Sequence, residues 1–149
     1  MSVIFFDTCV LIDCLGKKGE EAERVISHMH NAGYGLTTSI SVVGEMIQIS
    51  ILKGLDFNRL ISIISRYEIE IIFPLNEFRS WFEEVETSLA RNGIYGSSST
   101  DRLHVAFALM IKADVFVTSA GEVRSLHRPR GAATWPRVMD LIGLRADIG

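Results

Sequence analysis

Acidic residues occur where the chain is expected to pass from a strand to a helix, or to lie along a helix face: Asp7, Glu45, Asp101 and Glu122. Asp7 directly follows a short apolar run, Val3–Phe6. A buried strand that delivers a carboxylate to a helix N-terminus places it at the carboxyl edge of the sheet, where open α/β sheets bind ligands. If the other acids converge there, their oxygen atoms suit Mg²⁺ or Mn²⁺.

Each of these acids also has a plain structural explanation. Asp7 could simply cap a helix, and Asp101, in the first turn of its helix, favours the helix dipole. Glu45 lies one turn past Ser41 among apolar residues, so it either reaches water at the edge of the apolar stripe or needs a partner or a cation. His104, one turn after Asp101, could touch a phosphate, although packing against a strand is the simpler role.

Short apolar runs alternate with longer amphipathic segments, which indicates βαβ units and a parallel sheet. Strands are predicted at 3–6, 35–38, 68–73 and 114–118. Helices are predicted at 20–31, from 39 or 41 to 53, at 57–67, 76–91 and 101–112. Candidate helix caps are Gly33, Ser39 or Ser41, Gly54, Asp56, and Ser99 or Thr100.

The helix predicted at 76–91 carries aromatic residues at helical spacing, so we expect them to pack into the core rather than to stack on bases. Residues 92–100, rich in Gly and Ser, form the clearest loop and lead directly to Asp101. Beyond residue 118 the sequence predicts a basic stretch and a short apolar tail.

Composition predicts one ordinary globular domain over residues 1–149, with 48% hydrophobic and 22% charged residues and a net charge of −3. Residues 102–137 are locally basic, which is compatible with a phosphate-bearing substrate and also with a solvated surface. Cys9 and Cys14 are expected to be small buried or half-buried thiols in a reducing compartment. No secretory signal or membrane-length apolar run is apparent, so we expect a cytoplasmic protein.

Four segments in order resemble the PIN-domain family, the nuclease domain of many bacterial and archaeal toxins. They are Phe5 to Asp13, Thr38 to Glu45, Thr100 to Ala106, and Asp114 to Ser119. The resemblance implies a three-layer α/β/α fold around a mostly parallel sheet of about four to five strands. It also implies a divalent-metal-dependent endoribonuclease using Mg²⁺ or Mn²⁺, homodimerisation, and inhibition by an antitoxin whose segment plugs the acidic groove.

The resemblance also assigns roles to residues. Asp7, Glu45 and Asp101 correspond to the family's catalytic, metal-binding acids, and Thr8 and Thr118 would support them. Crowded carboxylates repel one another, so metal binding is expected to stabilise the fold.

The chain departs from the family at one position: Thr118-Ser119-Ala120 lacks the aspartate expected at Ala120. Glu122 falls where many members carry an additional acid and would partly compensate as a metal ligand. The departure predicts weakened activity or none, which leaves a non-catalytic PIN-like module binding RNA or protein as the alternative.

Basic residues near the acids would follow a single-stranded or looped RNA backbone and make binding sensitive to salt: Arg102, Arg124, Arg128 and Arg130. Two other α/β classes fit less well. A receiver-like phosphotransfer domain would need an acidic pair after the first strand and a lysine after a late strand, and both are missing. A dinucleotide-binding fold would need a glycine-rich loop after the first strand.

Overall fold

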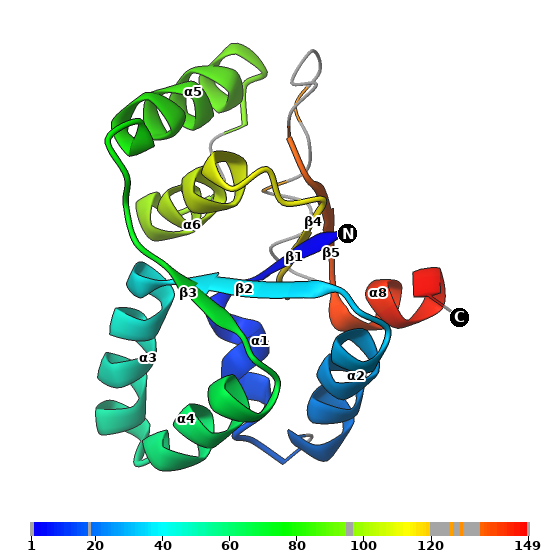
Figure 1. Cartoon of the computed structure of the whole chain (residues 1–149). Coiled ribbons are helices and arrows are strands. Elements are labelled where there is room, and N and C mark those ends of the chain that lie inside the picture. The colour runs from blue at the N-terminus through cyan, green and yellow to red at the C-terminus, as the bar shows by residue number, and fades with distance from the viewer. Residues whose placement is uncertain are drawn as a thin grey trace.

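A central sheet of five parallel strands organises the computed structural model, which describes residues 2–17, 19–94, 97–119, 126, 129 and 135–148 (Figure 1). The spatial order of the strands is β3-β2-β1-β4-β5. Their bounds are β1 Val3–Phe6, β2 Gly35–Ser39, β3 Glu70–Ile72, β4 Val115–Val117 and β5 Arg137–Met139. The prediction of an α/β fold with a parallel sheet is confirmed.

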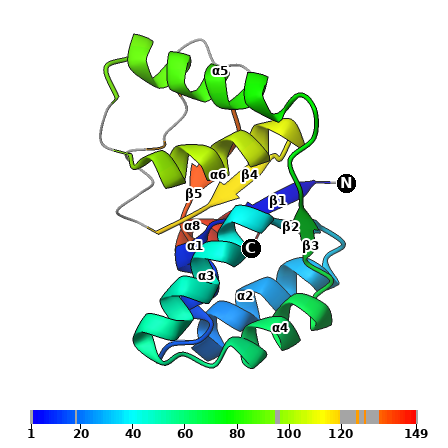
Figure 2. The same cartoon turned by 90° about the vertical axis from the view of Figure 1, so that its left-hand side faces the viewer.

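Helices cover both faces of this sheet. The described helices are α1 (Thr8–Asp13), α2 (Gly19–Asn31), α3 (Ile40–Lys53), α4 (Phe57–Arg66), α5 (Phe78–Arg91), α6 (Ser99–Met110) and α8 (Leu141–Ile148). Helices α5 and α6 lie on one side, whereas α1, α2 and α4 lie on the other (Figures 1 and 2). Helix α3 is in contact with both α1 and α6, so it brings the two layers together beside the sheet.

The order of the strands places a switch point at the centre of the sheet. The chain runs from β1 outward through β2 to β3, and then returns to form β4 on the other side of β1. Ligands of open α/β sheets bind outside the carboxyl ends of the strands at such a point. The order also differs from the 2-1-3-4-5 arrangement of receiver-like folds, which removes that alternative.

Local capping signals explain where several helices begin and end. The Ser39 side chain accepts a hydrogen bond from the Val42 N–H, and Asp56 does the same for α4, as predicted. Gly54 ends α3 in the left-handed region, at φ 63°, where a side chain would be strained. The cap of α6 is Ser98, so the prediction of Ser99 or Thr100 is wrong by one or two residues.

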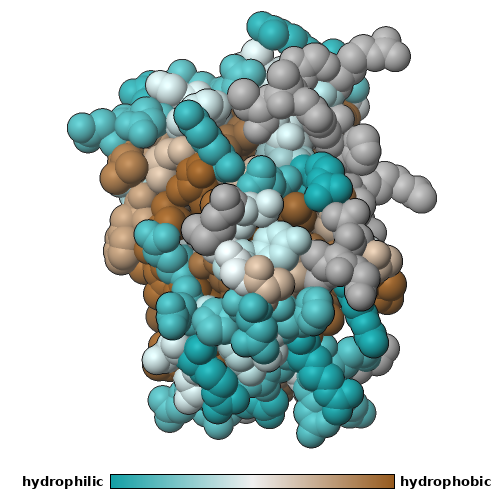
Figure 3. All heavy atoms as spheres, turned by 45° about the vertical axis from the view of Figure 1, so that its right-hand side comes forward, coloured by the Kyte–Doolittle hydropathy of each residue, from teal (hydrophilic) through white to brown (hydrophobic). Residues whose placement is uncertain are grey.

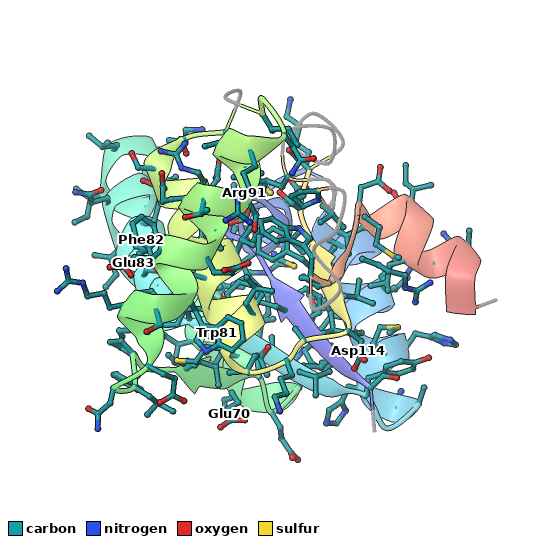
Figure 4. All side chains as sticks on the ribbon, turned by 90° about the horizontal axis from the view of Figure 1, so that it is seen from above. Glu70, Trp81, Phe82, Glu83, Arg91 and Asp114 are labelled. Atoms are coloured by element: carbon teal, nitrogen blue, oxygen red, sulfur yellow. The ribbon has the colours of Figure 1, made fainter. Side chains whose placement is uncertain are left out.

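The core lies on both sides of the central strands. Phe5 of β1 stacks on Phe116 of β4 with ring centroids 5.4 Å apart, and both are buried. Helix α6 is buried from His104 to Met110, because α5 covers its outer side. Trp81 and Phe82 of α5 (Figure 4) are half-buried against this core, which confirms that they pack rather than form an exposed stacking platform.

Strand β5 and helix α8 were not predicted. Both are short, and β5 is defined by its register with β4, in which Val115 pairs with Arg137, rather than by a local pattern. Hydrophobic side chains reach the surface in places (Figure 3). Near the end of α3, Ile51 and Leu52 are exposed. Within the described residues no helix is both long and apolar enough to cross a bilayer.

Candidate functional site

Asp7 stands at the switch point, immediately after the central strand. Its N–H donates to the Val117 carbonyl at 2.9 Å, which extends the β1–β4 pairing by one residue. Its carboxylate caps α1 by accepting the Thr8 N–H at Oδ1, 2.7 Å away, and accepts the Thr118 hydroxyl at Oδ2, 2.8 Å away. The side chain is only 3% exposed. The strand and the two threonines therefore fix both oxygens of this buried acid.

Burial raises the pKa of Asp7 above its ordinary value. The nearby His104 ring, the Thr118 hydroxyl and the Thr8 N–H all act to lower that pKa, and the negative charge of Asp101 raises it further. The net direction is upward because loss of water disfavours the charged carboxylate. Acidic residues whose pKa is shifted by burial and by nearby charges are common at functional sites.

His104 of α6 lies against Asp7 and Glu45 and is fully buried. Its Nε2 atom is 3.7 Å from Asp7 Oδ1, 3.6 Å from Glu45 Oε2, and 3.3 Å from Thr8 Oγ1. Its Nδ1 atom contacts Ser41 Oγ at 2.9 Å. One imidazole thus joins the end of β1, the start of α1 and the first turns of α3.

Glu45 satisfies both descriptions left open by the sequence. Its side chain is 29% exposed, so it reaches water, and it also faces His104 at the edge of the apolar stripe. The residues beside it on α3, Val42 and Met46, are fully buried. Helix α3 therefore presents one carboxylate at the boundary between the core and the solvent.

Asp101 lies in the first turn of α6, as predicted, and its N–H donates to the Ser98 hydroxyl at 3.1 Å. It is half-buried, and His104 follows one turn later. Its charge acts on Asp7, although the closest groups in direct contact with Asp7 are threonines and His104. The structure therefore groups Asp7, Glu45 and His104 most tightly, with Asp101 beside them.

The three acids are the right ligand type for a hard divalent cation, but they are spaced too widely to bind one together. Asp7, Glu45 and Asp101 offer carboxylate oxygens, the ligand type that Mg²⁺ and Mn²⁺ prefer. Over the ranges that the structure describes, no group of three His, Cys, Asp or Glu residues is gathered closely enough to hold a metal ion. A three-ligand site would need Asp7, Glu45 and Asp101 to come closer together.

The neighbouring thiol does not compete for this role. Cys9 Sγ lies 3.4 Å from Thr118 Oγ1 and 3.9 Å from Asp7 Oδ2. Burial and the charge of Asp7 raise the pKa of Cys9 to about 11, so the thiol is neutral at physiological pH. Cys9 is half-buried and Cys14 is buried, and both are free, as predicted.

Other predicted residues have different outcomes. Thr8 and Thr118 both contact the site directly. The Arg102 guanidinium donates to Glu86 of α5 at 2.6 Å and to the Ser97 carbonyl at 2.5 Å, so it ties the start of α6 to α5. The remaining predicted positions lie outside the described residues: Ala120, Glu122, Arg124, Arg128 and Arg130.

The contacts of His104 with Thr8, Ser41 and the two acids were not predicted. Its spacing of three residues from Asp101 placed it on the acidic face of its helix, which was the only signal available. The proximity of Ser41 and Thr8 could not be read from the sequence, because it depends on how α3 packs against α1 and α6.

Two solved structures share this architecture over nearly their whole length. VapBC2 from Rickettsia felis, bound to a DNA fragment from its promoter, matches with a TM-score of 0.69 and 15% identity, covering 93% of this chain and 98% of that one. The 2.2 Å structure of VapBC-1 from nontypeable Haemophilus influenzae matches with a TM-score of 0.65 and 16% identity, covering 94% and 98%. The fold is PIN-like.

Neither a protein-family model nor a curated protein sequence matches this PIN-like chain. Identities of 15% and 16% establish a shared fold and nothing finer.

Proposed function

We propose that this protein is a divalent-metal-dependent endoribonuclease that hydrolyses RNA phosphodiester bonds and acts as the toxin of a toxin–antitoxin pair. The observation that carries the proposal is Asp7, a buried carboxylate of raised pKa at the switch point of a PIN-like sheet, with Glu45 facing the same imidazole. A cation beside Asp7 would reverse the cost of its buried charge. The similarity to two VapBC structures supports the toxin–antitoxin assignment.

In this proposal Asp7, Glu45 and Asp101 hold Mg²⁺ or Mn²⁺, and Glu122 adds a fourth acid. Such an ion, when bound, polarises the phosphodiester and lowers the pKa of a coordinated water. Hydrolysis forms one P–O bond from water and breaks the P–O bond to a ribose oxygen, so that the products are a phosphomonoester and a hydroxyl.

The protein's own groups have separate tasks in that step. Glu45 reaches solvent and can accept the proton released by the attacking water. The proton is returned to the departing ribose oxygen through solvent. Thr118 and the Thr8 N–H keep Asp7 in one orientation throughout, because each is bonded to a different carboxylate oxygen.

RNA would be held as single strands or loops, by basic side chains that make binding sensitive to salt. Arg124, Arg128 and Arg130 are the proposed contacts. Arg102 was proposed with them, but its ion pair with Glu86 and its bond to the Ser97 carbonyl favour a role in fixing the loop before α6. Its replacement should alter catalysis more than the salt dependence of binding.

We further propose a cytoplasmic, single-domain protein that forms a homodimer and is inhibited by a cognate antitoxin. The antitoxin would place a segment over the acidic groove, since covering Asp7 and Glu45 blocks both metal and RNA. Light scattering of the purified protein, alone and with a co-expressed antitoxin, tests the assembly. A monomer at micromolar concentration would contradict the dimer.

The alternative is a PIN-like module that binds RNA or protein without cutting. Ala120 favours it, because the family carries an aspartate at that position. This alternative predicts RNA binding with no cleavage in Mn²⁺, even after prolonged incubation.

The test is cleavage of a panel of structured and single-stranded RNAs in Mg²⁺ or Mn²⁺. Wild type, Asp7→Asn and Ala120→Asp are compared, with Glu77→Gln as a matched control because Glu77 is exposed and makes no capping bond. The proposal expects metal-dependent cutting that is lost in Asp7→Asn, kept in Glu77→Gln and increased in Ala120→Asp. RNA binding without cutting by any version would favour the module.

A further inference from the structure

We propose that His104 is a positioning residue whose Nε2–H, oriented by a relay through Ser39 and Ser41, holds the carboxylates of Asp7 and Glu45 in place for the metal. This inference rests on the proposed function. It assigns a task to the buried imidazole of α6, which faces Asp7 at the end of β1 and Glu45 on α3.

The relay begins at the cap of α3. Ser39 Oγ accepts the Val42 N–H at 3.2 Å, and its own hydrogen is then available for Ser41 Oγ at 2.8 Å. In that direction the Ser41 hydroxyl donates to His104 Nδ1, 2.9 Å away. If Ser41 donated to Ser39 instead, the hydroxyl hydrogen of Ser39 would need a different acceptor. The described contacts of Ser39 Oγ are the Val42 N–H, which is a donor, and the Ser41 hydroxyl.

The other side of the ring leads to the same assignment. Nε2 faces the Thr8 hydroxyl and two carboxylates, and ionised carboxylates can only accept hydrogen bonds. An unprotonated nitrogen there would point its lone pair at negative oxygens. Both sides therefore place a hydrogen on Nε2 and leave Nδ1 as the acceptor of the Ser41 hydroxyl.

The consequence for the site is preorganisation. The carboxylate contacts, at 3.6 and 3.7 Å, are longer than hydrogen bonds, so the N–H attracts both acids without locking either one. Glu45 has a long side chain that would otherwise be free to turn toward water. The imidazole keeps it beside Asp7, as partners behind metal ligands commonly do.

Two substitutions separate the two ends of the ring. In His104→Gln the amide N–H₂ can reach the place of Nε2, whereas in His104→Asn the shorter amide reaches only the place of Nδ1 and bonds Ser41. We expect His104→Asn to weaken Mn²⁺ binding, measured by calorimetry, by about 10- to 100-fold. His104→Gln should recover most of that loss, and cleavage should follow the same order.

His30→Asn is the matched control, because His30 lies on α2 and faces Glu68 at the opposite end of the sheet. It should leave Mn²⁺ affinity unchanged. A wild-type protein that binds Mn²⁺ no better than a folded His104→Asn variant would overturn the positioning role alone. A wild-type protein that binds no Mn²⁺ would overturn the proposed function itself.

A measurement on the unmodified ring keeps the relay testable even if the variants fail to fold. Long-range ¹H–¹⁵N spectra distinguish a protonated from an unprotonated ring nitrogen. We expect hydrogen on Nε2 and none on Nδ1 in wild type, with a mixed signal in Ser41→Ala. Hydrogen on Nδ1 in wild type would overturn the relay.

Discussion

An aspartate stands at each end of the central β1–β4 pair, and the two differ in almost every physical respect. Asp7 follows β1 and is buried, and its carboxylate is bound by threonines. Asp114 precedes β4 and is exposed, and its Oδ2 accepts the Val3 N–H at 2.7 Å (Figure 4). Asp114 thus caps the start of a strand at the surface, whereas Asp7 belongs to a buried polar cluster.

The comparison shows that location, rather than residue type, separates a structural acid from a functional candidate. The amino edge even holds a cavity of about 440 Å³, lined by groups such as Tyr34, Tyr67, Glu68 and Glu70. It lies beside the beginnings of the strands, however, whereas α/β sheets place ligands at the carboxyl ends. We therefore assign the proposed chemistry to the carboxyl end of the sheet.

The largest expected difference is in RNA cleavage after replacement of one glutamate at each end of the sheet. Glu45→Gln removes a proposed ligand and proton acceptor, so RNA cleavage should fall by at least the roughly 10- to 100-fold that outer partners of metals are worth. Glu70→Gln, at the exposed start of β3, should leave the rate unchanged in the same gel assay. An equal loss of RNA cleavage in the two variants would contradict the assignment of the chemistry to the carboxyl end of the sheet.

An added negative charge should raise Mn²⁺ affinity at the carboxyl end of the sheet and not at the amino end. Ala120→Asp restores the acid that the family resemblance implies and should raise Mn²⁺ affinity about tenfold, the smaller effect expected of one further charge within about 4 Å of a cation. Ala32→Asp adds the same charge on an exposed position before β2 and should do nothing. Calorimetric titration compares them, and an unchanged Ala120→Asp would show that this position is misassigned.

Metal binding should stabilise the carboxyl end and thereby the whole fold. At a concentration 100 times its Kd, Mn²⁺ should add about 2.7 kcal/mol to the free energy of unfolding. Thermal melts should show this gain in wild type and in Asp114→Asn, and should show none in Asp7→Asn. A gain that survives Asp7→Asn would place the cation elsewhere.

Without metal, Asp7 should lower stability at neutral pH. Because its pKa is raised, Asp7 binds a proton more tightly in the folded state than in the unfolded chain. Its contribution to the free energy of unfolding is therefore fully favourable below pH 3.8 and is lost as the pH rises through the raised pKa. In EDTA at pH 7.5, Asp7→Asn should therefore melt higher than wild type, by about 2–4 °C for each kcal/mol. The gap should close toward pH 4, and a gap that widens would contradict the burial argument.

Much of the fold could be predicted because its signals are local. The apolar run before Asp7, the Ser39 cap and the glycine that ends α3 each act within a few residues of the chain. Strand β5 could not be found in this way, since three residues pair with β4 only after the chain has folded back. The Ser98 cap was missed because three serines and a threonine in succession offer the same chemistry.

The candidate site was only partly predictable for the same reason. Asp7 and Thr118 could be expected to meet, because both follow parallel strands that end at one edge. The partners of His104 and Arg102 depend on the packing of helices, which periodicity does not specify. Arg102 illustrates this, because a basic residue beside an acid suggested a phosphate contact and the structure pairs it with Glu86.

We propose that the carboxyl end of the sheet, and not its amino end, binds a divalent cation. Anomalous diffraction from crystals soaked in Mn²⁺ tests this most directly. We predict a peak in contact with carboxylate oxygens of Asp7 and Glu45, and no peak at Asp114. A peak confined to the amino end, or no peak beside Asp7 at saturating Mn²⁺, would contradict it.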